Sequence, residues 1–386
     1  MKILYVTLQF YPNAYGSGIH AYEICKQLLN LGYKVVILTL SKFNRLSHEN
    51  WNGLEIYRIR LPFNNPYYNP LNPLIFWLLG KRIAGKIKAD ILIGHGFETS
   101  LFIKYSKIPI KIYKANGSMI VQNKIRPKIT WQDKLGKIGF YFLSKLEKEA
   151  CKFSDRIIAI SGSIKKELSL NYNISPSKII KIFNGIDYNR FNIKNQNNIH
   201  RKFKKVIYVG RLSSIKGPQN ILKIVPSIIL KYGKNIRFEF IGNGPLYKYL
   251  KRMLKNSKYL DFIKFIGAVP NNKMPLIYSN ADLCIIPSYY EPFGLVALEC
   301  IASNLPVLAS NIGGLSEIFN KFNNDLLFSI KNKEELINKT ISNLSKTRKL
   351  NSQEKINQFL EKNFNWAENA LQTHRLILQI KRSKNL

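Results

Sequence analysis

The chain has 386 residues, with 60 Lys and Arg against 23 Asp and Glu, which gives a formal charge of +37. This length predicts two domains of ordinary size. A hydrophobic content of 46% supports folded cores and excludes a disordered chain. The four Cys are far apart and form no CxxC pair, so they exclude a disulfide scaffold and indicate thiols in a reducing compartment.

The apolar segments exclude two further classes. The longest apolar run, residues 74–79, is far shorter than the roughly 18–20 residues that span a bilayer. Residues 1–8 become polar too soon for a secretory signal and are typical of a first strand. We therefore expect a cytoplasmic protein, and peripheral attachment to the inner face of the cell membrane is a further expectation.

The positive charge has two interpretations. It reflects a general abundance of surface Lys, or it serves an anionic partner such as phospholipid headgroups, a phosphate-bearing acceptor or nucleic acid. No acid lies between Glu55 and Asp90 or between Glu98 and Asp133, while basic and aromatic residues are interleaved there. These stretches, which contain basic but no acidic residues, favour an anionic partner for the first half of the chain.

The first half alternates short apolar runs with helix-length amphipathic segments. Residues 19–31 have helical spacing and end at Gly32, which suits a helix C-cap. Strands are predicted at residues 3–8, 35–40, 91–93, 110–113 and 157–160. Strands that alternate with helices predict a parallel sheet covered on both faces.

The second half repeats this pattern after an Asn- and Lys-rich segment, residues 189–205, which we interpret as a linker. Strands are predicted at residues 206–209, 238–241, 262–266, 283–286 and 307–309. Helices are predicted after Pro218, from Pro245, from Gly294 and over residues 366–380. We therefore expect an α/β protein with two Rossmann-like domains, residues 1–188 together with a C-terminal helix at 365–386, and residues 206–364.

Gly16, Ser17 and Gly18 fit a GxGxxA pattern between a strand and a helix. Such a turn can present backbone N–H groups to a phosphate. The gap after the first strand is too long for a dinucleotide fingerprint, and the second strand ends without an acid for a ribose, so NAD is disfavoured. A loop near some other phosphate and a plain flexible turn both remain open.

Two cations and a glycine turn follow strands of the second half. Arg211 and Lys216 lie in the loop after one strand, where two positive charges suit a diphosphate. Gly242 lies in a glycine turn that precedes a helix. Each of these residues alone would be typical of a surface loop. Only their occurrence together indicates a diphosphate-binding site.

Two carboxylates form the most specific pattern. Glu291 and Glu299 flank Gly294, where a helix is predicted to begin and to offer N–H groups to an anion. Glu299 lies inside a largely apolar helix, where a carboxylate is costly unless it meets polar groups such as ligand hydroxyls. A capping or surface role is common for one such Glu, but the pair around a Pro-Phe-Gly loop favours a binding site.

These patterns add up to a family resemblance. The segments that carry it are residues 184–187, 209–212, 216–217, 242–245, 280–288, 291–299, 306–310 and 313–318, with Phe364 and Trp366. The chain resembles the retaining glycosyltransferases of family 4 (group 1), whose Glu-x7-Glu signature stands here as Glu291 and Glu299. The resemblance covers essentially the whole chain and is weaker in the first half. It implies the GT-B fold, in which two Rossmann-like domains face a central cleft and the last helix crosses back to the first domain.

The resemblance implies a role for each matching residue. Arg211 and Lys216 would bind the donor diphosphate, Glu299 would hold the nucleotide ribose, and Glu291 would contact the donor sugar. Further donor contacts are implied for Gly242, Phe293, Gly294, Leu295 and Val296. Gly16, Ser17 and Gly18 would lie in the first-domain loop, near the diphosphate and the acceptor.

Two positions depart from the family pattern. Tyr15 stands where the family often has a glycine, and Asn116 stands where it often has a His. Asn116 can donate a hydrogen bond but cannot carry a proton, which puts an acid/base role there in doubt. His95, at another predicted strand end, is a second acceptor-side candidate, although a lone His at a strand end more often has a purely structural role.

The implied chemistry needs no cofactor, because the nucleotide-sugar is itself a substrate. Arg211, Lys216 and a helix N-terminus would stabilise the charge on the departing nucleoside diphosphate. The seven Asp include no Asp-x-Asp pair, so a metal-bridged diphosphate is not required. The resemblance implies retention through a same-face transfer in which the donor phosphate helps to take the acceptor proton.

The partners are less defined on the acceptor side. Tyr67-Tyr68 and the apolar run precede Lys81, Arg82, Lys86 and Lys88, which suits an interfacial helix on anionic lipid, with an ordinary core helix as the alternative. We expect a hexose donor of the GDP-mannose or UDP-glucose type and a glycan or lipid-linked acceptor, or alternatively a soluble cytosolic acceptor. A nucleic-acid-binding protein fits the charge but leaves Glu291 and Glu299 unexplained, so no nucleic-acid partner is expected.

Overall fold

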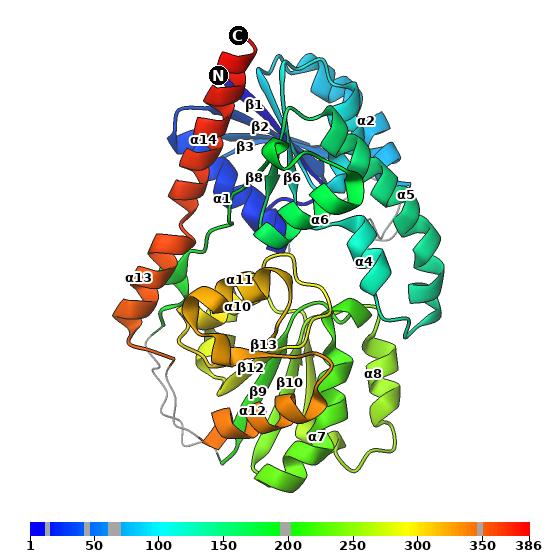
Figure 1. The fold of residues 1–386 in the computed structure, drawn as a ribbon, viewed down its shortest axis with the longest axis vertical. Coiled ribbons are helices and arrows are strands. Elements are labelled where there is room, and N and C mark those ends of the chain that lie inside the picture. The colour runs from blue at the N-terminus through cyan, green and yellow to red at the C-terminus, as the bar shows by residue number, and fades with distance from the viewer. Residues whose placement is uncertain (12–15, 42–46, 61–70, 194–201, 346–349) are drawn as a thin grey trace. The chain divides into compact units, whose positions relative to one another are not determined.

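The structure is a computed structural model of the chain. It describes all residues except 12–15, 42–46, 61–70, 194–201 and 346–349, and leaves out the side chains of residues 131, 132 and 135. The chain forms two compact units, each built on its own sheet (Figure 1). Unit 1 comprises residues 1–124, 135–185 and 364–386, and unit 2 comprises residues 125–134 and 186–363.

Unit 1 has an eight-stranded sheet in the order β3-β4-β2-β1-β5-β6-β7-β8, parallel except for the β3–β4 pair. Its strands are β1 (Lys2–Thr7), β2 (Lys34–Leu40), β3 (Ser47–Trp51), β4 (Leu54–Ile59), β5 (Ile91–His95), β6 (Ile110–Ala115), β7 (Arg156–Ala159) and β8 (Ile179–Lys181). The helices around it are α1 (Gly16–Asn30), α2 (Asn72–Lys86), α3 (Ser100–Tyr105), α4 (Met119–Ile125), α5 (Trp131–Phe153), α6 (Gly162–Tyr172) and α14 (Trp366–Ser383). Its central strands are buried along nearly their whole length, as expected for a sheet covered on both faces.

Two helices from opposite ends of the sequence cover one face of this sheet. Ile24 of α1 and Ile377 of α14 share a buried core with Ile3 and Tyr5 of β1 (Figure 1). Alternate residues of a strand face opposite sides, so Leu4 points to the other face, which α2 and α3 cover. The last helix therefore belongs to the first unit, as the sequence predicts.

Helix α2 contains the predicted apolar and basic run. Phe76 is buried against Phe102 of α3, with ring centroids 5.2 Å apart, while Leu74 and Leu78 are exposed. The basic residues of this run are exposed as well, namely Lys81, Arg82, Lys86 and Lys88. One side of the helix thus packs into the core, and the other side exposes apolar and basic residues at the surface. No helix in the described part of the chain is long and apolar enough to cross a membrane.

Unit 2 has a six-stranded parallel sheet in the order β11-β10-β9-β12-β13-β14. Its strands are β9 (Lys204–Val209), β10 (Ile236–Ile241), β11 (Ile263–Gly267), β12 (Leu283–Ile286), β13 (Val307–Ser310) and β14 (Leu327–Phe328). Its helices are α7 (Pro218–Tyr232), α8 (Tyr247–Leu254), α9 (Met274–Ser279), α10 (Leu295–Ala302), α11 (Gly313–Phe322), α12 (Lys333–Ser345) and α13 (Gln353–Asn363). Val225 of α7, Leu250 of α8 and Ile337 of α12 share one buried core with the strands. The expected α/β architecture with two Rossmann-like units is therefore confirmed.

Several elements differ from the predicted ones. The strands β3 and β4 were not predicted, and they form a hairpin whose turn residues Asn52 and Gly53 have φ values of +51° and +79°, as a type I′ turn requires. The short parallel strands β8 and β14 were also missed. Three helices begin at other residues than predicted, at Gly16 for α1, Tyr247 for α8 and Leu295 for α10.

The segment interpreted as a linker, residues 189–205, is only partly described. Residues 194–201 lie outside the described residues, as do Tyr15 and Tyr67-Tyr68. Tyr188–Phe191 forms a 3₁₀ turn in unit 2, where the buried Phe191 packs against Tyr278 with ring centroids 6.0 Å apart. Lys204 and Lys205 already belong to β9.

A buried carboxylate holds together the elements around the end of β6. Glu147 of α5 accepts hydrogen bonds from the Tyr113 hydroxyl at 3.1 Å, the Tyr172 hydroxyl at 2.6 Å and the Met119 N–H at 2.7 Å. Burial raises the pKa of Glu147 to about 7, while these three donors act in the opposite direction. Because Met119 begins α4 just after Asn116, this network positions the Asn116 loop.

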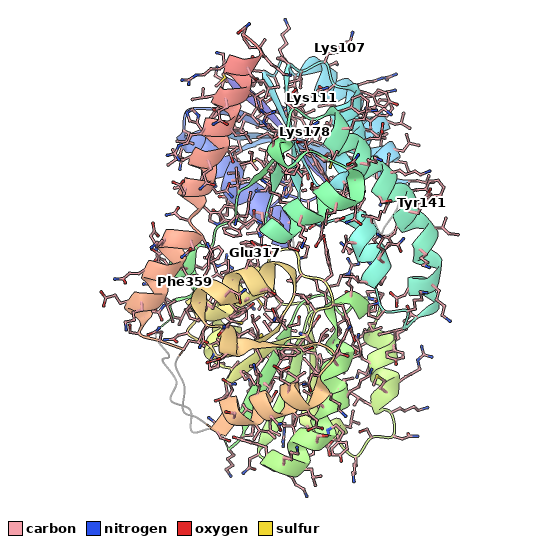
Figure 2. All side chains as sticks on the ribbon, in the orientation of Figure 1. Lys107, Lys111, Tyr141, Lys178, Glu317 and Phe359 are labelled. Atoms are coloured by element: carbon pink, nitrogen blue, oxygen red, sulfur yellow. The ribbon has the colours of Figure 1, made fainter. Side chains whose placement is uncertain are left out.

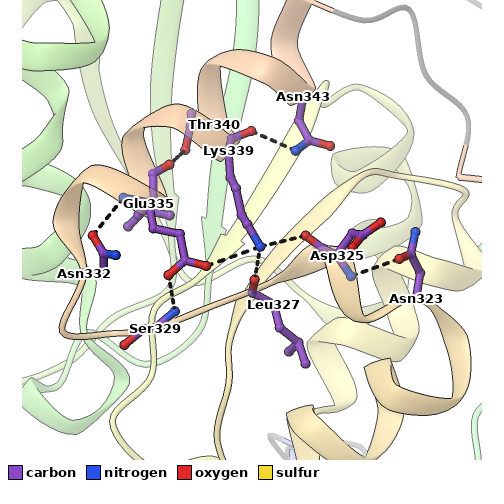
Figure 3. A network of polar contacts seen from close by, with 10 residues as sticks. Asn323, Asp325, Leu327, Ser329, Asn332, Glu335, Lys339, Thr340 and Asn343 are labelled. Atoms are coloured by element: carbon purple, nitrogen blue, oxygen red, sulfur yellow. Dashed lines mark hydrogen bonds and ion pairs between the residues drawn. The ribbon is translucent and has the colours of Figure 1, made fainter.

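A polar network anchors α12 to the edge strand β14 (Figure 3). The Lys339 Nζ donates to the carbonyl oxygens of Asp325 at 3.0 Å and Leu327 at 2.5 Å, and it pairs with Glu335 at 3.3 Å. Glu335 in turn accepts from the Ser329 N–H at 2.9 Å. The ammonium group thus donates to two main-chain carbonyls at this edge of the sheet, one in β14 and one in the 3₁₀ turn before it.

Replacing Lys339 with methionine is expected to lower the free energy of unfolding of unit 2 by about 1–2 kcal/mol, because two carbonyls lose a charged donor. Chemical denaturation monitored by circular dichroism measures the change. The matched control is Lys333→Met in the first turn of the same helix, where the side chain is exposed. Equal effects of the two substitutions would contradict the anchoring role.

Candidate functional site

The parallel strands of unit 2 end at loops that contain the donor-side residues singled out in the sequence. Backbone hydrogen bonds join these loops, from the Tyr289 N–H to the Ile215 oxygen at 2.8 Å and from the Gly314 N–H to the Glu291 oxygen at 2.9 Å. Ligands of open parallel sheets bind at the carboxyl ends of the strands. This edge of unit 2 is therefore the candidate donor site.

Lys216 and Glu291 meet across two of these loops. The Lys216 Nζ lies 2.8 Å from the Glu291 Oε2, and the Ser288 hydroxyl donates to the same oxygen at 3.3 Å. Both charged side chains are partly buried. Arg211 is exposed at the start of the same loop as Lys216, and its carbonyl accepts from the Tyr208 hydroxyl at 2.7 Å. The structure thus brings together two predicted site residues that are 75 positions apart.

Two glycines let these loops pack backbone against backbone. Gly217 has a φ of +71°, and a Cβ there would lie 1.8 Å from the Pro287 oxygen. Gly242 has a φ of +131°, and a Cβ there would lie 2.0 Å from the Gly210 oxygen. No side chain fits at either position without moving main chain, so Gly217 holds Lys216 beside the loop of Glu291, and Gly242 holds its own turn against the loop of Arg211.

Glu299 is held inside α10, as its place in the sequence predicts. Its Oε2 accepts a hydrogen bond of 2.5 Å from the Tyr278 hydroxyl. Burial raises the pKa of Glu299 to about 7, while Tyr278 and the positive charge of Arg190 act in the opposite direction. The carboxylate therefore has one protein donor and an environment in which further hydroxyl donors would stabilise its ionised form.

The N-terminus of α10 lies between the two carboxylates in the sequence. Phe293 is buried, and Gly294 precedes the helix with a φ of +114°. Leu295 and Val296 are its first residues. The first N–H groups of a helix have no carbonyl partners within it, and the helix dipole favours an anion there. The arrangement can bind phosphate or hydroxyl oxygens.

The predicted glycine loop of unit 1 is helical. Gly16, Ser17 and Gly18 form the first turn of α1, where the prediction placed a loop, and the Ser17 hydroxyl donates to the Gln9 Oε1 at 3.2 Å. Residues 12–15, which precede them in the sequence, lie outside the described residues. These residues lie at the carboxyl end of β1, where a helix N-terminus favours an anion.

His95 and Asn116 meet at the carboxyl ends of β5 and β6. The His95 Nε2 lies 2.7 Å from the Asn116 Oδ1, and its Nδ1 lies 3.0 Å from the Tyr5 hydroxyl. Burial, with a further contribution from Lys114, lowers the pKa of His95 to about 3, so the imidazole is neutral. In the tautomer with Nε2–H, Tyr5 donates to Nδ1 and the amide NH₂ of Asn116 remains for another acceptor. His95 thus orients Asn116 and has no ring nitrogen left for a proton transfer.

Sequence reasoning missed four polar residues near the candidate site residues, one in unit 1 and three in unit 2. Glu98 follows β5, and burial raises the pKa of its carboxyl group to about 7. One Glu98 oxygen lies 2.5 Å from where a Cβ on Gly96 would stand, and the Asn116 Nδ2 lies 3.8 Å from the same point. The other three are Tyr278, Ser288 and Arg190. Glu98 could have been found as an acid beside a Gly-His-Gly strand end, and Ser288 as the last residue of the segment 280–288 that carries the resemblance, whereas Tyr278 and Arg190 carry no sequence signal.

Two family models match the chain, and together they run from residue 14 to residue 363. The model described as "Glycosyltransferase Family 4" matches residues 14–190. The model described as "Glycosyl transferases group 1" matches residues 189–363. The boundary between the two matches falls close to the last crossing from unit 1 into unit 2, at residues 185 and 186.

Curated relatives are similar over most of the chain. An uncharacterised glycosyltransferase of Methanocaldococcus jannaschii is 27% identical over 355 residues, which are 87% of this chain and 87% of the relative. The GPI3 subunit of phosphatidylinositol N-acetylglucosaminyltransferase from Saccharomyces cerevisiae is 22% identical over 80% of this chain and 68% of its own length. Both similarities span the two units.

Solved structures share the fold at low sequence identity. Sucrose-phosphate synthase from Thermosynechococcus elongatus superposes with a TM-score of 0.80 at 20% identity and covers 99% of both chains. Anabaena HepE in complex with UDP-glucose gives a TM-score of 0.74 at 18% identity, with 98% of this chain and 100% of that chain covered. The solved structures show the GT-B fold, and the two family models show that the chain belongs to the family-4 (group 1) glycosyltransferases.

Proposed function

We propose that the protein is a retaining glycosyltransferase that moves a hexose from a nucleoside-diphosphate sugar to a glycan or lipid-linked acceptor at the cytoplasmic membrane face. The observation that carries the donor part is the Lys216–Glu291 pair at 2.8 Å, in the loops that also contain Arg211 and lead into α10. Cations for a diphosphate and a carboxylate for sugar hydroxyls are thereby joined at one sheet edge. HepE, which shares the fold, is known with UDP-glucose, and this supports a hexose donor of that type.

In this proposal, Arg211 and Lys216 bind the diphosphate and stabilise the charge that develops on it as the sugar leaves. Glu291 accepts from the hydroxyls of the donor sugar, and Glu299 accepts from the ribose. The backbone N–H groups of the Phe293–Val296 segment and the Gly242 turn complete the donor contacts. No metal ion is needed in this scheme, since the two side-chain cations meet the negative charge.

The proposed transfer retains the configuration of the sugar. The acceptor hydroxyl attacks from the face that the diphosphate leaves, and the leaving phosphate oxygen takes the acceptor proton. Asn116 would bind a sugar or acceptor hydroxyl, with its amide group as donor, and His95 would orient Asn116. A neutral, fully partnered His95 fits a positioning role better than an acid/base role.

The acceptor part of the proposal rests on unit 1. The exposed Leu74 and Leu78 share α2 with exposed Lys and Arg, which suits contact with an anionic membrane. The yeast relative is named as a transferase that acts on a phosphatidylinositol, and this supports a lipid-linked acceptor. A soluble acceptor is the alternative, and the lipid-binding experiment below distinguishes the two.

A thermal-shift screen tests the donor. The full chain is measured with GDP-mannose, UDP-glucose, UDP-N-acetylglucosamine, UDP, GDP and NAD, each with a chelator present. A donor at about 100 times its Kd stabilises the folded state by about 2.7 kcal/mol. We expect one nucleotide family to raise the melting temperature and NAD to leave it unchanged. A folded protein that responds to none of them would contradict the proposed function.

Retention and metal independence have their own readouts. NMR of the first product formed from the identified donor shows whether the anomeric configuration of the sugar is kept. We expect the donor configuration in the product and a rate that a chelator leaves unchanged. An inverted product, or a rate restored only by added divalent metal, would overturn the corresponding part of the mechanism.

Donor binding is expected to weaken as the pH falls below about 7. The Glu299 carboxyl has a pKa raised to about 7, and only its ionised form accepts two hydroxyl hydrogen bonds, so protonation removes an acceptor from the ribose. The donor Kd therefore rises by up to about tenfold per pH unit below that value. Calorimetric titration of the sugar nucleotide between mildly acidic and mildly basic pH measures the change.

The control for this prediction is Glu299→Gln, which cannot ionise. Its donor Kd is expected to be weak and independent of pH over the same range. The phosphates of a sugar nucleotide do not titrate near neutrality, so they add no slope of their own. A pH dependence that persists in Glu299→Gln would assign the titration to another group.

A further inference from the structure

A cavity of about 440 Å³ opens in unit 1, away from the candidate donor-side and acceptor-side residues. It lies between the C-terminal ends of α2 and α3, at the edge of the sheet where β5 and β6 begin. Leu4, Leu92 and Phe102 line its interior, with Trp77 and Tyr105 at its sides. His95 and Asn116 end or follow the same strands, so the cavity lies at the opposite sheet edge and is separate from the candidate acceptor site. Its volume is typical of a small-molecule site.

Three lysines from three different segments surround this apolar cavity. Lys81 comes from α2, Lys88 from the loop before β5, and Lys107 from the loop before β6. Lys81 lies over the Trp77 ring, with its Nζ 4.7 Å from the ring centroid, and the Lys107 side chain stands at this end of unit 1 (Figure 2). No acidic residue of the described chain lines the cavity. An apolar interior with a cationic rim matches an anionic amphiphile.

The surface around the cavity has the same character. Helix α3 lies between α2 and α5, since Tyr105 contacts Trp77 with ring centroids 5.1 Å apart and Lys104 pairs with Glu149 of α5 at 2.6 Å. Tyr141 on α5 is exposed and lies beneath the Lys145 ammonium at 4.6 Å (Figure 2). The exposed apolar residues of these helices are Leu74, Leu78, Leu79, Tyr105, Ile138, Tyr141, Phe142 and Phe153. We call this surface the basic-aromatic face.

We propose that the cavity takes one acyl chain of an anionic bilayer phospholipid, with Lys81, Lys88 and Lys107 around its phosphate. The basic-aromatic face then lies on the membrane, with aromatic side chains at the headgroup level. A free phosphate would leave the apolar walls in water, and an uncharged lipid would leave the lysines without a counter-charge. This inference rests on the proposed membrane function and names the surface and the lipid that it uses.

The binding of an anionic headgroup by the three lysines is tested with vesicles and the full chain. Sedimentation with phosphatidylcholine vesicles is compared with and without phosphatidylglycerol. We expect binding only to the anionic vesicles, and the triple variant Lys81→Gln, Lys88→Gln, Lys107→Gln is expected to bind on the order of a hundredfold more weakly. The control, Lys223→Gln, Lys248→Gln, Lys255→Gln, removes the same charge from exposed positions of unit 2. Equal loss in both triple variants would overturn the inference, because only net charge would then matter.

The chain-binding part is tested by filling the cavity. Gly85 lines it, and a Cβ there would meet no atom within 4 Å, so Gly85→Leu places a side chain in the opening without strain. We expect this variant to lose stabilisation by short-chain phosphatidylglycerol below its micelle concentration. The control is Gly136→Leu on α5, where a Cβ makes only ordinary contacts with Phe140. Equal responses of the two variants, or equal binding of glycerol phosphate without chains, would overturn the proposed occupant.

The same samples separate this inference from the proposed function. Donor stabilisation is measured without lipid in the parent chain and in the Gln variant of Lys81, Lys88 and Lys107, which we expect to respond alike. A parent chain that binds its donor but no anionic vesicle refutes the lipid site and leaves the transferase. A parent chain that binds vesicles but no sugar nucleotide refutes the donor proposal and leaves the lipid site.

Discussion

Replacing Lys216 with methionine is expected to lower the kcat of sugar transfer by about 100- to 1,000-fold. The ammonium group lies 2.8 Å from the Glu291 carboxylate, in a loop that a buried backbone contact at Gly217 holds in place. A preorganised charge of this kind stabilises the departing diphosphate more in the transition state than in the ground state, so kcat falls more than donor affinity. Steady-state kinetics with the donor identified by the thermal screen measures the effect.

The matched control for Lys216→Met is Lys223→Met on α7, where the side chain is exposed. It removes the same charge from unit 2 and is expected to leave kcat unchanged. The double variant Lys216→Met, Glu291→Gln is expected to lose little more than one single variant, because each residue acts through the other. A kcat near the parental value in Lys216→Met, or strictly additive losses, would contradict the proposed role of the pair.

Replacing Gly217 with alanine is expected to lower the free energy of unfolding of unit 2 by about 3 kcal/mol or more. The left-handed φ of +71° disfavours a side chain, and the added Cβ would lie 1.8 Å from the Pro287 oxygen, so main chain must move. Because that movement displaces Lys216, the variant is also expected to lose stabilisation by the sugar nucleotide. Denaturant unfolding and the thermal screen measure the two effects.

Gly267→Ala is the control that separates the clash with Pro287 from the cost of the left-handed backbone conformation. Gly267 also belongs to unit 2 and has a φ of +84°, but a Cβ there would meet only the Asn243 side chain at 3.6 Å. Its substitution is expected to cost about 1–2 kcal/mol from the backbone conformation alone. If both alanines destabilise unit 2 equally, the contact with Pro287 does not constrain the loop.

The sequence predicts the central strands well because they are buried on both faces. β12, for example, was predicted with the observed bounds, Leu283–Ile286, since its apolar run has clear polar limits. The hairpin of β3 and β4 was missed because β3 is polar and largely exposed, so its residues show no apolar alternation. The Asn52-Gly53 dipeptide carries the signal for that hairpin, since both residues adopt the positive φ of a type I′ turn.

The candidate site was predictable where its residues follow a local pattern and not where they depend on distant partners. Glu291, Gly294 and Glu299 lie within one loop and helix, so their spacing could be interpreted directly. The Tyr278–Glu299 and Tyr5–His95 hydrogen bonds join residues 21 and 90 positions apart, and no local rule pairs them. His95 therefore looked like an independent candidate, although in the structure it orients Asn116.

The position of α14 in unit 1 has a consequence for biosynthesis. Trp366 and Ile377 complete the buried core that α1 shares with β1, yet they follow the earlier parts of unit 1 by about 180 residues. At ribosomal speeds of about 5–20 residues per second, the parts of unit 1 that end at residue 185, α1 among them, wait at least roughly 10–40 s for this helix. Unit 2 is synthesised during that interval from a nearly continuous stretch. The second unit can therefore fold first, and chaperone binding to nascent chains should centre on α1.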